Sequence, residues 1–161
     1  MQQPNQTAAH SGEVTQPRLA LVLDGDLFFA VKVASTLTHA GFAAQTVRRL
    51  DAFTTALAAQ RPAVALVNTA ARALDWRAAI VAARAANVPV VAYGAHVDLA
   101  AQDAARQAGA TAIIANSKLA SDLPAVVARA LRRAARAATG TEQTAVSAPD
   151  TLAAERARDA Q

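Results

Sequence analysis

Short apolar runs alternate along the chain with longer segments in which apolar residues recur at three- and four-residue steps. The five apolar runs lie at residues 19–23, 42–47, 63–67, 90–93 and 112–115. The segments that follow them have the apolar spacing of amphipathic helices. This alternation is typical of βαβ units, and runs that are apolar throughout suit strands covered on both faces. We therefore predict an α/β fold: a doubly wound, five-stranded parallel sheet with five helices.

Capping and turn residues predict where several helices begin and end. Asp51 and Asp98 are suitable N-caps for the second and fourth helices, and Gly109 supplies a left-handed residue that ends the fourth. Ser121 is the predicted N-cap of the last helix. Pro124 then falls in the first turn of that helix, where a missing N–H does no harm.

The folded domain is predicted to span residues 18–138. Residues 1–17 are rich in Gln, Thr, Ser and Pro, and residues 139–161 lack an apolar face, so both ends are expected to be disordered. The first segment lacks the pattern of a signal peptide, and no stretch reaches the roughly 20 apolar residues that span a bilayer. The chain has no cysteine, which excludes thiol catalysis and thiolate metal sites. We expect a cytoplasmic protein without membrane contact.

The basic residues do not form the footprint of a nucleic-acid-binding protein. The net charge is +4, and blocks of basic residues with interleaved aromatics are missing. One basic stripe does occur on the last predicted helix, at i, i+3, i+4 and i+7: Arg129, Arg132, Arg133 and Arg136. It is either a surface for an acidic partner or a solvated face that suits the helix dipole.

Polar residues follow the predicted strands and form the candidate site, because the carboxyl ends of parallel strands meet at one edge of the sheet. The set comprises Asp24, Gly25, Asp26, Asn68, Thr69, Gly94, His96, Asn116 and Ser117. His96 near Asp24 and Asp26 could be a proton shuttle or a metal ligand. A local hydrogen-bonding role is the favoured interpretation of this single loop histidine. Asp24 and Asp26 alone could hold a divalent ion weakly.

From about Arg18 to Ala137 the chain resembles the receiver domain of bacterial response regulators. The resemblance rests on the order of elements, the acidic residues after the first strand, and residues 88–95 (VPVVAYGA) and 105–112 (ARQAGATA). Residues 26–30 (DLFFA) and 94–97 (GAHV) are similar to short, stand-alone degenerate receivers. The resemblance implies a flavodoxin-like receiver topology, with an aspartate at the end of the third strand that accepts a phosphoryl group beside a magnesium ion.

The residues expected for that chemistry are missing at most positions. Asp24 fits the first acidic position, and the other matched positions carry Gly25 for an acid, Asn68 for the phosphoacceptor, Gly94 for a hydroxyl, Asn116 for a lysine and Ser117 for a proline. Magnesium prefers charged oxygen ligands, so the site has lost most of its attraction for the ion. We therefore predict a pseudo-receiver without a cofactor, in which Mg²⁺ binding is doubtful.

The predicted function is a non-catalytic regulatory or protein-interaction module in bacterial signal transduction. A protein partner is expected, and a homodimer stays open. Phe28 and Phe29 are adjacent and cannot both face the core, and we place Phe29 with the arginine stripe on the partner surface. One alternative is a working receiver phosphorylated at Asp24 or Asp26. A second is a small-molecule binder at the strand-end crevice, although no phosphate-binding glycine motif follows any predicted strand.

Overall fold

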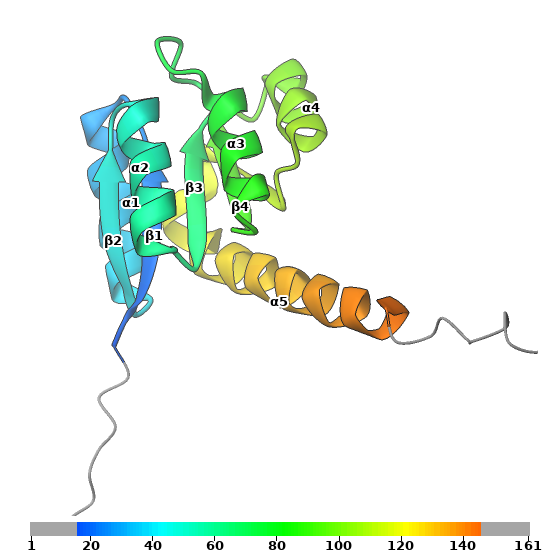
Figure 1. Ribbon diagram of the computed structural model, residues 1–161. Helices are drawn as coiled ribbons and strands as arrows, with labels where there is room; N and C mark the ends of the chain where they lie inside the picture. The colour runs from blue at the N-terminus through cyan, green and yellow to red at the C-terminus, as the bar shows by residue number, and fades with distance from the viewer. Residues whose placement is uncertain (1–15, 146–161) are drawn as a thin grey trace, which may run out of the picture.

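The computed structural model describes residues 16–145, which form a parallel sheet of strand order β2-β1-β3-β4-β5 (Figure 1). The strands are β1 (Arg18–Leu23), β2 (Phe42–Val47), β3 (Val64–Asn68), β4 (Val90–Gly94) and β5 (Ala112–Ala115). The helices are α1 (Leu27–His39), α2 (Leu50–Gln60), α3 (Trp76–Ala85), α4 (Leu99–Ala108) and α5 (Leu119–Ala145), with a 3₁₀ turn η1 (Asn116–Lys118). The predicted doubly wound α/β fold is confirmed.

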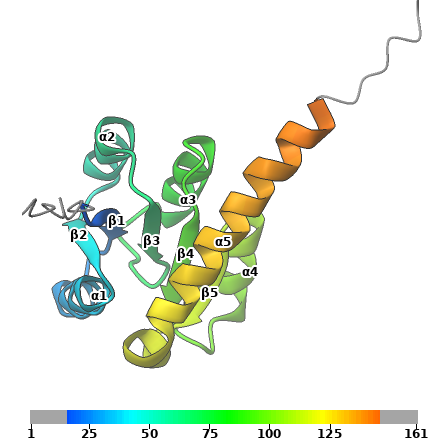
Figure 2. The same ribbon diagram turned by 90° about the horizontal axis from the view of Figure 1, so that it is seen from below.

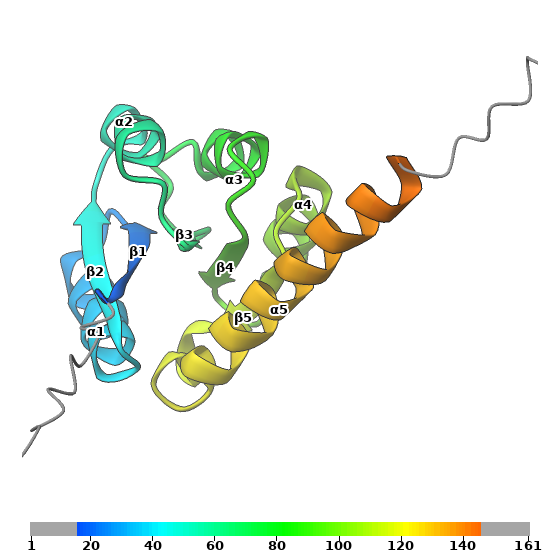
Figure 3. The same ribbon diagram turned by 60° about the horizontal axis from the view of Figure 1, so that its bottom comes forward.

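Each face of the sheet has its own apolar core, because successive side chains of a strand point to opposite faces. Leu21 and Leu23 pack with α2, α3 and α4, whereas Ala20 and Val22 pack with α1 and α5. Figure 3 shows α2 and α3 on one side of the strands and α1 on the other. Burial on both faces explains why the central strands β1, β3 and β4 are mainly apolar, whereas the edge strand β2 is partly exposed and includes Gln45 and Thr46.

The chain reverses its direction of winding between the central strands β1 and β3. β1 pairs with β2 on one side and with β3 on the other, so the connections after these two strands lead to opposite edges of the sheet. In open α/β sheets a crevice forms at such a switch point, beyond the carboxyl ends of the strands. Asp24 follows β1 and Asn68 ends β3 at this place.

Two of the predicted helix caps are wrong. Helix α2 begins at Leu50, with Arg49 as N-cap, and Asp51 lies in the first turn, where its carboxylate accepts hydrogen bonds from Arg49. Ser121 also lies inside its helix, because η1 runs directly into α5 at Leu119. The caps Asp98 and Gly109 are confirmed, the latter at φ 104°.

Helix α5 is longer than predicted and continues to Ala145, past the domain boundary expected at residue 138. At 1.5 Å per residue its length is about 40 Å, and Figure 2 shows its C-terminal part extending beyond the sheet. Disorder was expected for residues 1–17 and 139–161; residues 139–145 are instead part of α5, and most of the rest of both segments lies outside the described residues. Within residues 16–145, no helix is long and apolar enough to cross a membrane.

Candidate functional site

The carboxylate of Asp24 is fully buried at the end of β1 and is satisfied by three hydrogen bonds. Its Oδ1 accepts from the backbone N–H of Asp26 and from Nδ2 of Asn68, both at 2.8 Å. Its Oδ2 accepts from the hydroxyl of Tyr93 at 2.5 Å. A buried charge is stable only when it is paired or hydrogen-bonded, and these donors supply that stabilisation without a cation.

Tyr93 donates to Asp24 from β4, on the far side of β3. Burial raises the pKa of its phenol well above the ordinary value, and the charge of Asp24 and the hydrogen bond to it raise the pKa further. The phenol is therefore protonated and remains a donor. The position was not among the candidate site residues, because a tyrosine in an apolar run is ordinarily a core residue.

Asn68 is held at both ends of its amide and is 3 % exposed. Its Oδ1 accepts from the backbone N–H of Ala70 at 2.8 Å, while Nδ2 donates to Asp24. These two contacts fix the orientation of the amide. A carboxylate at this position would lose the donor and would place a second negative charge against Asp24.

Thr69 fills the space that a side chain at position 94 would occupy. A Cβ added to Gly94 would overlap Oγ1 of Thr69, which itself donates to the carbonyl of Tyr93 at 3.2 Å. The hydroxyl at this edge therefore comes from the residue after β3, and the absence of a side chain at Gly94 makes room for it.

The cluster of Asp24, Asp26 and His96 that was considered as an alternative is not formed among the described residues. Asp26 is the N-cap of α1, with its carboxylate accepting from the backbone N–H groups of Phe28 and Phe29. His96 and Ser117 are exposed and do not line the pocket at the strand ends. Among the described residues no three His, Asp or Glu side chains are grouped to hold a metal ion.

The residues at the strand ends do not fit a magnesium ion. Both oxygens of Asp24 already accept hydrogen bonds, position 25 is a glycine, and the amide nitrogen of Asn68 is directed at Asp24. Mg²⁺ needs oxygen ligands in near-octahedral geometry and gives up its water reluctantly. Asp26 alone retains an exposed carboxylate in the described lining of this site.

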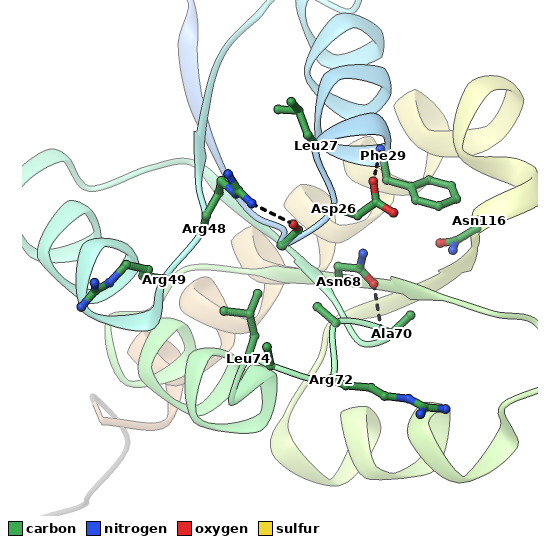
Figure 4. Close-up of a pocket in the computed structure, with 13 residues that line it drawn as sticks. Asp26, Leu27, Phe29, Arg48, Arg49, Asn68, Ala70, Arg72, Leu74 and Asn116 are labelled. Atoms are coloured by element: carbon green, nitrogen blue, oxygen red, sulfur yellow. Dashed lines mark hydrogen bonds between the residues drawn. The ribbon is translucent and has the colours of Figure 1, made fainter.

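A pocket of about 970 Å³ opens at the switch point (Figure 4). The structure brings Gly25, Asp26, Asn68 and Asn116 together in its lining, as predicted from the strand ends. It also adds residues that were not predicted: Leu27, Phe29, Arg48, Arg49, Ala70, Ala71, Arg72, Ala73 and Leu74. Arg48 and Arg49 directly follow β2, so the strand-end rule applied to that strand would have found them.

The residues expected on a partner surface differ in their exposure. Phe29 is half-buried against the core and lines the pocket, whereas Phe28 is 72 % exposed, so the assignment of the exposed ring to Phe29 is wrong. The reason is the register of α1, which turns Phe28 outward beside Leu27 and Val31. The arginine stripe is exposed on α5, and Nη1 of Arg133 donates to the carbonyl of Thr111 at 3.2 Å.

No protein-family model and no curated protein matches the sequence, but solved structures match the fold. The receiver domain of NtrX from Brucella abortus is 22% identical, with a TM-score of 0.65 over 70% of this chain and 98% of that one. The N-terminal domain of a response regulator/sensory box/GGDEF 3-domain protein from Carboxydothermus hydrogenoformans is 20% identical, with a TM-score of 0.67 over 75% and 99%. The longer NtrX chain gives a TM-score of 0.71 at 20% identity, and the match spans 79% of this chain and 29% of that one.

Proposed function

We propose that this chain, whose fold is that of the response-regulator receiver domain, is a pseudo-receiver that regulates a signalling partner in the bacterial cytoplasm by direct contact. On this proposal it is not an enzyme and does not carry an acyl phosphate at the end of β3. The observation that carries the proposal is the hydrogen bond from Nδ2 of Asn68 to the buried carboxylate of Asp24.

The chemistry of an amide supports the absence of phosphotransfer. Formation of an acyl phosphate needs a carboxylate oxygen as nucleophile, and the oxygen of Asn68 belongs to a neutral amide that already accepts from Ala70. Among the described residues no lysine lines the pocket to offset the charge of a phosphoryl group, since Asn116 occupies the corresponding edge. Loss of the nucleophile, the metal ligands and the cation at one site supports retention of the fold for binding.

The principal alternative is phosphorylation at a displaced aspartate. Asp24 is fully buried and engaged by three donors, so a phosphodonor cannot reach it in the folded state. Asp26 is exposed in the pocket, and this observation makes it the residue on which the alternative depends.

Intact-protein mass spectrometry tests the proposal. The chain is incubated with Mg²⁺ and acetyl phosphate, and an active receiver domain is treated in parallel. We expect the active receiver to gain the mass of a phosphoryl group and this chain to remain unmodified. A phosphorylated species that disappears in the Asp26→Asn variant would replace our proposal with that of a working receiver.

Exposed apolar side chains on α1 support a role in protein contact. Leu27, Phe28 and Val31 are 65 %, 72 % and 59 % exposed and adjoin one another along the first turns of the helix. A cluster of large apolar side chains on a surface is typical of an interaction site. The arginine stripe on α5 supplies a second, basic surface for an acidic partner.

A further inference from the structure

The strand-end pocket has an excess of unpaired positive charge. Three arginines line it against one acid, Asp26, whose charge is offset by the N-terminus of α1. Arg49 is neutralised by Asp51 at 2.8 Å, outside the pocket. Arg48 makes one long hydrogen bond, 3.5 Å to the carbonyl of Gly25, and Arg72 has no polar partner among the described residues.

These two arginines line the pocket from different elements. Arg48 follows β2, and Arg72 belongs to the loop between β3 and α3. Figure 4 shows them on opposite sides of Asn68, with the side chain of Arg72 extending away from it. Guanidinium groups bind phosphate and carboxylate through paired N–H donors, so an anion in the pocket would be held from two sides once the exposed side chain of Arg72 turns inward.

The rest of the lining suits an organic body rather than a bare ion. Leu27, Phe29 and Leu74 contribute apolar surface beside the arginines. The volume of about 970 Å³ lies at the upper end of the range of about 300–1,000 Å³ that is usual for small-molecule sites. The pocket also lies at the switch point of the sheet, where ligands of open α/β folds bind.

Asn116 supplies an independent indication of a ligand. Its side chain lines the pocket, and its Oδ1 is buried without a hydrogen-bond partner among the described residues. A buried carbonyl oxygen without a donor is costly, and such atoms in proteins usually meet water or a bound molecule. Because this oxygen is closed to solvent in its present orientation, we expect the amide of Asn116 to turn toward a ligand that presents an N–H or O–H group.

We propose that this pocket binds a small organic phosphate monoester of about mononucleotide size. Its phosphate lies between Arg48 and Arg72, its apolar or planar part contacts Leu27, Phe29 and Leu74, and a donor group reaches Asn116. Two guanidinium groups favour the doubly charged phosphate over a single carboxylate. The pocket of this chain is thus positively charged at the place where receiver domains, the family that the sequence resembles, bind a magnesium ion. The proposal does not depend on whether Asp26 can be phosphorylated.

Binding is tested with defined probes on the full chain. Adenosine 5′-monophosphate and phenyl phosphate are titrated by calorimetry and by ¹⁵N NMR, each beside its dephosphorylated counterpart, adenosine or phenol. We expect both phosphates to bind and to shift the side-chain amide signal of Asn116 and the backbone signals of Gly25 and Ala71. The dephosphorylated compounds should bind at least about tenfold more weakly, because they lack the charge that the arginines recognise.

Matched variants assign the contacts. Arg48→Gln and Arg72→Gln should each weaken the phosphates by about tenfold, the effect of one lost charged contact, and Arg129→Gln on α5 should leave affinity unchanged. All three arginines are exposed, so their thermal midpoints should match that of the parent chain. The proposal is overturned if neither phosphate binds, if Arg48→Gln and Arg72→Gln have no effect, or if inorganic phosphate binds as tightly as both esters. Mass spectrometry of phosphotransfer is a separate readout, so either proposal can fail alone.

Discussion

Replacing Asn68 with aspartate should destabilise the fold at neutral pH, because the new carboxylate would face Asp24. The two side chains are joined by a hydrogen bond of 2.8 Å, which would become a contact between like charges. Two unit charges about 4 Å apart repel by about 4 kcal/mol at an effective dielectric constant of about 20. The new carboxyl can instead bind a proton, so the loss of stability cannot exceed about 1.4 kcal/mol for each unit by which the pH lies above the usual carboxyl pKa of about 4. We therefore expect a loss of about 3 to 4 kcal/mol at about pH 7.

The pH dependence of this loss identifies its cause. Repulsion by Asp24 would raise the pKa of the new carboxyl above its value in the unfolded chain. A group with a raised pKa in the folded state stabilises fully below its unfolded pKa, and this stabilisation is lost as the pH rises through the folded pKa. The variant should therefore approach the parent near about pH 4, where the protonated carboxyl at position 68 donates an O–H to Asp24 in place of the amide N–H.

Urea unfolding followed by tryptophan fluorescence measures these differences, since Trp76 is the single tryptophan and is 8 % exposed. Asn68→Ser is the neutral control, and its cost should not vary between about pH 4 and about pH 7. Exchanging the two groups in Asp24→Asn with Asn68→Asp should recover at least half of the loss, because one carboxylate again meets one amide. A loss below about 1 kcal/mol at about pH 7, or an equal loss under acidic conditions, would refute the reasoning.

Tyr93, position 94 and the two exposed surfaces are each open to a direct test. Tyr93 is the single tyrosine, so it alone supplies phenolate absorbance. Because its pKa is raised, this absorbance should appear in an alkaline titration only as the chain unfolds. Titration of the folded chain near about pH 10 would contradict the buried contact. Gly94→Thr should cost about 1 to 3 kcal/mol through overlap with Thr69, and adding Thr69→Ala should relieve most of this in thermal unfolding. Phe28→Asp or Arg132→Glu should abolish capture of a signalling partner without changing the thermal midpoint; retention of every partner by both variants would rule out these surfaces.

Periodicity was sufficient to predict the sheet, because both faces of the central strands β1, β3 and β4 are covered and these strands are therefore distinct apolar runs. Strands β2 and β5 have the predicted bounds. Asp51 and Ser121 were wrongly predicted as caps for a local reason, because a cap depends on backbone geometry one or two residues away. Arg49 is the N-cap of α2, and η1 leads directly into α5 before Ser121. The length of α5 could not be predicted from burial, because the extension beyond the sheet has no apolar face to repeat.

The site was predictable only in part. The positions of the strand ends predict which residues lie close together, but they do not predict which hydrogen bonds those residues form. Asp24, Asn68 and Asn116 were correctly brought to one edge of the sheet. Whether Asp24 is a free ligand or a satisfied buried charge depends on Tyr93, which lies in an apolar run of another strand. The arginines that line the pocket were not predicted either. Arg72, for example, lies in the loop between β3 and α3, where the sequence has no periodic pattern.

The presence of Asp24 is therefore no argument for phosphotransfer by this chain. The amide of Asn68 and the hydroxyl of Tyr93 are both buried donors that need an acceptor, and the carboxylate of Asp24 serves both at once. Replacing Asp24 with an apolar side chain would leave these two buried donors without an acceptor, which would cost about 1 to 3 kcal/mol of stability for each donor. The buried carboxylate thus has a structural role, because it satisfies these donors. On our ligand proposal, Arg48 and Arg72 then set the charge of the open surface of the pocket.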